Sequence, residues 1–142
     1  MDSDRPRFSL LDHTADLGMQ VHGADLVNLF EEAARSIIYI MMRPPTAEKT
    51  DAMKLQVDGQ DLPDLMVRWL GEILYLLQGE KKVVTHVKID SLSPVHLVAT
   101  LKTVPFDPNR HEILCEIKAV TYHQIDVAQK NDKWEARVIF DL

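Results

Sequence analysis

Apolar and polar residues alternate over residues 112–127. Most odd positions are apolar or small, and most even positions carry charged or amide side chains. Alternation with a period of two residues is typical of a strand that is half buried. Because the run is longer than the roughly 3–10 residues of an ordinary strand, we expect a bulge or bend near residues 119–123. Lys118 would then lie in the middle of the sheet, on its polar face.

Two other segments, residues 26–41 and 62–77, carry apolar residues at helical spacing. Asp25 and Asp61 directly precede these segments and are plausible N-caps. Gly79 follows the second segment, as is common just after a helix. An amphipathic helix buries its apolar stripe against another element. We therefore expect both helices to pack flat against a sheet.

The two helical segments belong to a longer internal similarity. Residues 19–41 align with residues 55–77 without a gap, and eight of the 23 aligned positions are identical. The equal offset across strand, turn, cap and helix favours a duplicated strand-turn-helix unit within one domain. The alternative is convergence, because any strand, glycine turn and capped amphipathic helix share such features.

Shorter alternating runs predict further strands on either side of the helices. They cover residues 8–11, 16–22, 54–58, 83–89, 95–101 and 134–142. The turn-like residues 129–132 would join the last two strands as a hairpin.

This order of elements implies an α+β fold made by a single domain over residues 1–142, with residues 1–7 as a loose lead-in. The sheet would be mostly antiparallel or mixed, and both helices would pack on one of its faces. A chain of 142 residues is about one domain in length. At that size folding buries roughly 70% of the surface of the unfolded chain, which is enough for one core.

The charge balance narrows the range of partners. The chain has 22 Asp and Glu against 16 Lys and Arg, for a net charge of −6. Long-range attraction to phosphate backbones is therefore not expected to be its main source of binding, which disfavours direct binding of nucleic acid.

The single cysteine and the absence of a targeting segment indicate a cytoplasmic protein. Cys115 has no partner for an intramolecular disulfide and falls on the apolar phase of its expected strand, so we interpret it as a buried thiol in a reducing compartment. No window approaches ~18 uninterrupted apolar residues, and the N-terminus lacks the order of a signal peptide. We expect no association with a membrane.

Candidate chemistry lies at the ends of two predicted strands. Asp141 is on the polar side of the last strand, one residue from the chain end, and Asp16 begins an earlier strand on its polar side. Either this last strand is simply an edge strand, or the Asp141 carboxylate has a function there. In the purely structural interpretation, Asp16 ends a turn, Asp141 is solvated and Lys118 pairs with Glu116 or Asp126.

A set of landmarks in this order resembles the archease family, small proteins that assist RtcB-type, GTP-dependent RNA ligases. The landmarks are His13-Thr14-Ala15-Asp16, the helix with Trp69-Leu70, the run Glu116-Ile117-Lys118-Ala119-Val120-Thr121-Tyr122-His123, and Asp141. Together they span nearly the whole chain.

The resemblance implies a divalent metal ion, Ca²⁺ or Mg²⁺, bound by Asp16, Asp141 and Leu142. Physical chemistry allows this set, because two carboxylates with backbone carbonyls and water suit Ca²⁺ or Mg²⁺ better than Zn²⁺, which prefers nitrogen or sulfur. The resemblance also implies that Lys118 and Asp141 are needed to activate the ligase, and His13 is a supporting candidate. A histidine beside a threonine in a loop is, however, more often only hydrogen-bonded. The implied role is that of a non-catalytic activator that promotes guanylylation and multiple turnover of the ligase in tRNA splicing or RNA repair. RNA would be reached only through the ligase.

Two other functions remain open at this point. A small metal-dependent hydrolase could use the same aspartates, although the chain has no glycine-rich phosphate loop, nucleophile elbow, Cys-x-x-Cys or paired-histidine motif. A general chaperone or binding module is suggested by six methionines and a largely aliphatic composition.

Overall fold

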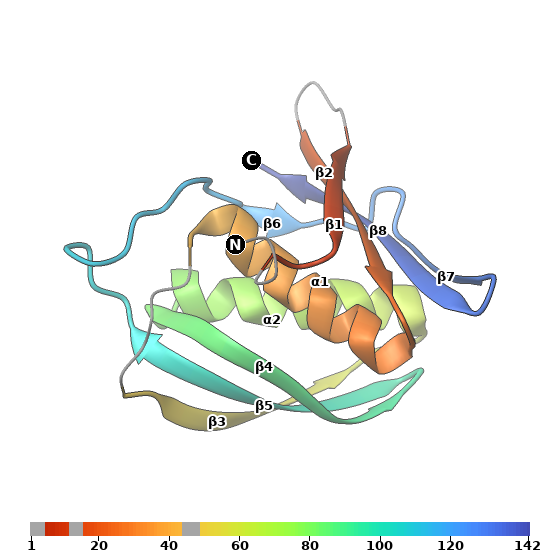
Figure 1. Cartoon of the computed structure of the whole chain (residues 1–142), viewed down its shortest axis with the longest axis horizontal. Coiled ribbons are helices and arrows are strands. Elements are labelled where there is room, and N and C mark those ends of the chain that lie inside the picture. Colours follow the sequence, from red (N-terminus) through yellow and green to blue (C-terminus); the bar gives the residue numbers. More distant parts are fainter. Residues whose placement is uncertain (1–4, 12–15, 44–48) are drawn as a thin grey trace.

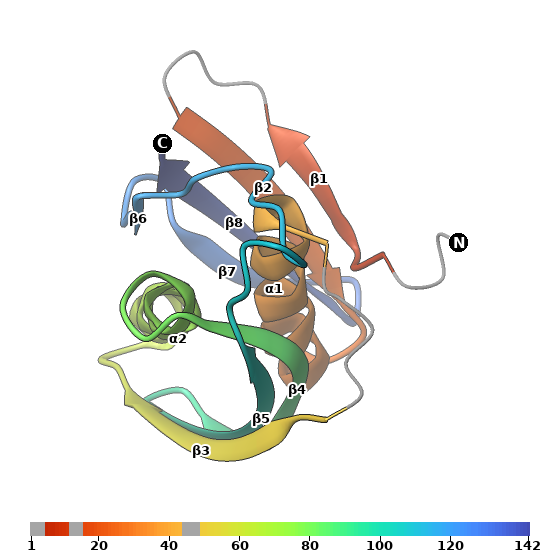
Figure 2. The same ribbon diagram turned by 90° about the vertical axis from the view of Figure 1, so that its left-hand side faces the viewer.

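Two antiparallel sheets face each other across a pair of helices in the computed structural model (Figures 1 and 2), which describes residues 5–11, 16–43 and 49–142. In chain order the elements are β1 (Phe8–Leu11), β2 (Asp16–Gly23), α1 (Leu26–Met41), β3 (Asp51–Asp58), α2 (Leu62–Gln78), β4 (Lys82–Ser93), β5 (His96–Pro105), β6 (Ala119–Val120), β7 (Asp126–Lys130) and β8 (Lys133–Asp141).

The first sheet has the order β1-β2-β8-β6, and β7 also pairs with β8. The second sheet has the order β3-β5-β4. Every pairing between neighbouring strands is antiparallel. The expected α+β class, single domain and antiparallel pairing are confirmed. The strands, however, are divided between two sheets, each with the helix pair on one face.

Both helices form where the sequence pattern predicts them. Asp25 accepts a hydrogen bond from the backbone N–H of Asn28 at 2.7 Å, and Asp61 accepts one from Asp64 at 2.9 Å. These side chains satisfy N–H groups that have no partner within the helix. Among the described residues, no helix has the length and apolar character needed to cross a membrane.

The apolar stripes of the two helices meet in the core between the sheets. Trp69 of α2 is fully buried, and its indole N–H donates to the backbone oxygen of Phe30 in α1 at 2.9 Å. Both helices contact strands of both sheets. Burial of one helix pair against two apolar sheet faces gives the chain a single core.

The two strand-turn-helix units share a close backbone approach. A Cβ at Gly23 would lie 2.5 Å from the backbone nitrogen of Leu29, and one at Gly59 would lie 2.9 Å from that of Leu65. Both glycines therefore let a strand end press directly on the first turn of the following helix. The common ancestry of the two units stays a prediction.

The prediction of one long strand over residues 112–127 is wrong. Residues 112–118 form no strand, β6 has two residues, and a turn in which Gln124 has a φ of 52° separates β6 from β7. The backbone N–H groups of Leu114 and Cys115 donate to the oxygen of Met41 at the end of α1. The segment finds its hydrogen bonds at a helix end, so its alternation does not lead to a ladder.

The expectation of a loose lead-in is wrong for residues 5–7, while residues 1–4 lie outside the described part of the chain. Pro6 is buried, and the N–H of Arg7 donates to the carboxylate of Glu32 in α1 at 3.1 Å. This bond fixes the entry into β1.

Substituting alanine at the glycines gives a matched test of the close approach. Gly23→Ala should destabilise the protein by roughly 1–3 kcal/mol, because the added methyl group meets backbone that has little freedom to move. Gly71 is the control, since nothing lies within 4 Å of its Cβ position inside α2. There alanine should stabilise by about 0.5–1 kcal/mol. Urea unfolding of both variants measures the difference, and equal stability would contradict the packing.

Candidate functional site

Asp16 and Asp141 lie opposite each other where β2 pairs with β8. Residues directly opposite in an antiparallel pair have their side chains on the same face of the sheet. The next pair is Leu17 with Phe140, and Phe140 is fully buried in the core. The two aspartates therefore share the outer face, where Asp16 is half-buried and Asp141 is exposed.

Lys118 lies near the same end of the β2–β8 ladder, on the side of β8 that pairs with β6. Its backbone N–H donates to the backbone oxygen of Asp141 at 2.8 Å, and the following residue, Ala119, is the register partner of Asp141. Lys118 is exposed and directly precedes β6, and it does not lie in the middle of a long strand. In the part of the chain that the structure describes, its ammonium group forms no ion pair with Glu116 or Asp126.

The side chains at this end of the ladder offer oxygen ligands of the kind that a hard divalent cation prefers. They are too few to enclose such a cation. Ca²⁺ takes roughly six to eight oxygen ligands and Mg²⁺ six, whereas the register of β2 and β8 brings the carboxylates of Asp16 and Asp141 to this end of the ladder. The expected contribution of Leu142 stays a prediction. No three His, Cys, Asp or Glu side chains within residues 5–11, 16–43 and 49–142 are grouped to hold a metal ion. His13 lies outside the described residues. Water or a partner's oxygen atoms would have to complete the coordination.

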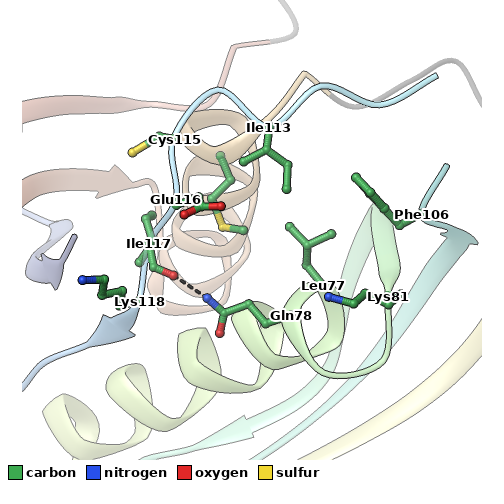
Figure 3. A pocket seen from close by; sticks show the side chains of 10 residues that line it. Leu77, Gln78, Lys81, Phe106, Ile113, Cys115, Glu116, Ile117 and Lys118 are labelled. Carbon is green, nitrogen blue, oxygen red and sulfur yellow. Dashed lines mark hydrogen bonds between the residues drawn. The ribbon is translucent and has the colours of Figure 1, made fainter. Parts of the chain in front are cut away.

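A pocket of about 250 Å³ lies beside this end of the ladder, between the ends of both helices and the segment that precedes β6 (Figure 3). Cys115 lines it and is half-buried, so the expectation of a fully buried thiol in a strand is wrong. Ile113 is 41% exposed and Leu114 is 50% exposed. The pattern of apolar residues does not predict this pocket, although Leu114 on the polar phase of the alternating run was a signal against a simple half-buried strand.

A polar clamp holds the turn after β6 against the start of α2. The Tyr122 hydroxyl donates to Asp64 Oδ1 at 2.7 Å, and Arg68 Nε donates to Asp64 Oδ2 at 3.0 Å. The hydrogen bond from Tyr122, together with the backbone bond from Gln60, lowers the pKa of Asp64 from 3.8. The same bond to Asp64 raises the pKa of Tyr122 above 10.0. The clamp fixes the short strand that follows Lys118.

Comparison with known families gives one match over nearly the whole chain. Residues 8–142 match the profile of the archease protein family (MTH1598/TM1083). Protein archease of Methanosarcina barkeri is 29% identical over 153 residues, covering all of both chains. Protein archease of Pyrococcus furiosus is 31% identical over 135 residues, covering 92% of this chain and 95% of the relative.

Solved structures agree with that match. The solution structure of protein 1598 of Methanobacterium thermoautotrophicum superposes with a TM-score of 0.75 at 30% identity, covering 95% of this chain and 98% of that one. The crystal structure of an archease from Thermotoga maritima, described as a possible chaperone, superposes with a TM-score of 0.62 and covers 93% and 94% of the two chains. At 19% identity the second likeness concerns the fold alone.

The pairing of the two aspartates predicts a cation-dependent stability. Like charges directly opposite in a sheet are destabilising, so Asp141→Asn should stabilise the metal-free protein by roughly 0.2–1 kcal/mol. Addition of Ca²⁺ should raise the melting temperature of the wild type and have less effect on the variant. Asp51→Asn, on an exposed residue of the second sheet, is the control. Calorimetry with EDTA and with Ca²⁺ measures both effects, and equal Ca²⁺ responses in all three proteins would exclude the pair as a ligand set.

The Tyr122 clamp predicts a pH-dependent contribution to stability. Because the pKa of Tyr122 is raised in the folded protein, its contribution is fully present below pH 10 and is lost as the pH rises through the raised pKa. Tyr122→Phe should therefore lower the melting temperature at pH 8 more than at pH 11. Tyr75→Phe is the control, because the two tyrosines are exposed to a similar extent, 54% for Tyr75 and 56% for Tyr122. A Tyr122→Phe effect of the same size at both pH values would contradict the clamp.

Proposed function

The chain belongs to the archease family, and from this premise we propose that it activates an RtcB-type, GTP-dependent RNA ligase. In this proposal the protein is not an enzyme. It promotes guanylylation of the ligase and restores its repeated turnover in tRNA splicing or RNA repair, in the cytoplasm. RNA is reached through the ligase, in keeping with the net charge of −6 on the activator.

The observation that supports the proposal most is that the main chains of Asp16, Asp141 and Lys118 meet at one end of the β2–β8 ladder. The resemblance singles out these residues from three distant parts of the chain. The ladder between β2 and β8 pairs the two aspartates, and one backbone hydrogen bond attaches Lys118 to Asp141. A set that is assembled only by folding, lies outside the core and exposes Lys118 and Asp141 to solvent is better suited to a partner than to stability.

Within the proposal, the two carboxylates hold a divalent cation and the lysine supplies a mobile positive charge. A bound Mg²⁺ or Ca²⁺ would stabilise negative charge that develops on the phosphate groups of GTP. The incomplete ligand set at this end of the ladder leaves coordination positions open for those phosphate oxygens. Lys118 is exposed, so its ammonium group can contact a ligase-bound phosphate directly.

The alternatives have weaker support. A metal-dependent hydrolase needs a nucleophile or activated water held by a fuller ligand set, and the described residues offer no group of three metal-ligating side chains. A general chaperone function rests on the description of the Thermotoga maritima relative as a possible chaperone and on the exposed Ile113 and Leu114. The chaperone alternative predicts suppressed aggregation of unrelated proteins.

RNA joining by the cognate RtcB-type ligase tests the proposal directly. With limiting ligase, GTP and Mn²⁺, the wild-type protein should convert a single turnover into many. Asp141→Ala and Lys118→Ala should each lower the maximum stimulation at least tenfold, because each removes one charge from the proposed phosphate contact. Formation of the guanylylated ligase, followed with radiolabelled GTP, should change in parallel.

Two exposed residues away from the site serve as matched controls. Lys133→Ala removes a lysine at the opposite end of β8, and Asp126→Ala removes an acid from β7. Both should stimulate the ligase like the wild type. Saturable GTP hydrolysis by the isolated protein that disappears in Asp141→Ala would overturn the activator proposal in favour of the hydrolase.

A further inference from the structure

The pocket beside Lys118 is apolar in its interior and open to solvent. Its apolar lining comes from the two helix ends and from the segment 106–118, and includes Met41, Leu77, Phe106, Ile113 and Ile117. Figure 3 shows the side chains of Leu77, Phe106, Ile113 and Ile117 around the end of α2. Partly exposed apolar side chains around a concave surface mark sites of interaction.

The volume of the pocket favours one kind of occupant. At about 250 Å³ it is smaller than the roughly 300–1,000 Å³ of sites that enclose a drug-sized ligand. It suits one bulky apolar side chain, such as Leu, Met or Phe. Single buried anchors of this kind supply much of the binding energy of protein interfaces. The occupant is therefore better described as an anchor residue of a protein than as a free metabolite.

The charges around the opening of the pocket indicate the charge of the partner segment that carries the anchor residue. Lys81 and Lys118 line the pocket on opposite sides of Gln78 (Figure 3), and Glu116 is the one acid among the described residues that line it. Both lysines are exposed. This local excess of positive charge lies on a chain whose net charge is −6. Charge complementarity therefore selects an acidic segment over a neutral or basic one.

The wall of the pocket is held in place by hydrogen bonds between the segment and the helix ends. The Gln78 side chain donates to the backbone oxygen of Ile117 at 2.5 Å, and the N–H of Leu114 donates to the oxygen of Met41 at 2.7 Å. The N–H of Phe106 donates to the oxygen of Lys81 at 2.7 Å. A pocket that is already formed avoids the entropy loss of ordering its wall when a partner binds.

The same wall continues into the proposed activation site. Ile117 lines the pocket and is 1% exposed, and the next residue, Lys118, donates its backbone N–H to Asp141. A partner held in the pocket therefore lies beside the edge that carries the aspartate pair.

We infer that this pocket is the docking site for an acidic segment of the partner ligase, which inserts one bulky apolar side chain between the helix ends. The inference rests on the proposed function and adds a separate binding step to it. The pocket provides affinity and orientation, while Lys118 and the two aspartates act on the nucleotide site.

Two perturbations test the docking site without altering the aspartate pair. Lys81→Glu reverses a charge at the opening, and Lys88→Glu, on an exposed residue of the second sheet, is its matched control. N-ethylmaleimide attaches a bulky group to Cys115, the single cysteine of the chain, and Cys115→Ser treated with the same reagent is the control.

The readout separates binding from activation. Lys81→Glu should raise the concentration of the protein that gives half-maximal stimulation of the ligase roughly three- to tenfold. Alkylation of Cys115 should raise the same concentration at least about tenfold, because the attached group excludes the anchor side chain from the pocket. The maximum stimulation at saturation should stay that of the wild type in both. Lys118→Ala should instead lower the maximum. Unchanged half-maximal concentrations for both perturbations would overturn the inference.

Protection of Cys115 decides the docking inference independently of stimulation. Excess ligase should slow the alkylation of Cys115 at least tenfold, even if the wild-type protein does not stimulate RNA joining, in which case only the proposed function fails. Protection by octanoate, or by a high concentration of the Cys115→Ser protein, with none by the ligase, would overturn the inference in favour of a small apolar acid or a second copy of the chain.

Discussion

The antiparallel ladder between β2 and β8 holds the first sheet together and brings the candidate functional residues to one place. It joins the two ends of the chain over eight register pairs, from Asp16 with Asp141 to Gly23 with Trp134. β8 also pairs with β6 and β7, so one strand organises the first sheet. Its inner face contributes Phe140 and Val138 to the core, while its outer face carries Asp141. Stability and candidate function therefore occupy opposite faces of the same ladder.

This separation explains why the fold tolerates two neighbouring carboxylates that repel each other and do not form a full set of metal ligands. The aspartates lie at the end of the ladder, next to solvent, where water screens their repulsion. The core does not depend on them, because the helix pair is buried between two apolar sheet faces and linked by the bond from Trp69 to Phe30. A site at the edge of such a core remains open to a partner, and the proposed activation of a ligase needs that access.

The segment from residue 112 to residue 118 shows how helix ends can compete with a sheet for a strand-like sequence. Its alternating residues would suit a half-buried strand, but its N–H groups and carbonyls meet the ends of α1 and α2 first. Ile117 is then buried while Ile113 and Leu114 stay exposed. The same competition places Cys115 in a pocket and Lys118 directly before a two-residue strand beside Asp141.

Features that depend on neighbouring residues could be predicted from the sequence. Helical periodicity, the Asp25 and Asp61 caps, the β7–β8 hairpin and the polar phase of Asp16 and Asp141 all follow from local spacing, and the structure contains each of them. The choice of paired strands depends on contacts that form only when the chain folds. Those contacts divide the strands between two sheets, pair the aspartates between β2 and β8, and form the pocket. Strand pairing and helix-end contacts join residues distant along the chain, and a one-dimensional pattern of polarity carries no information about which distant backbone group will be the partner.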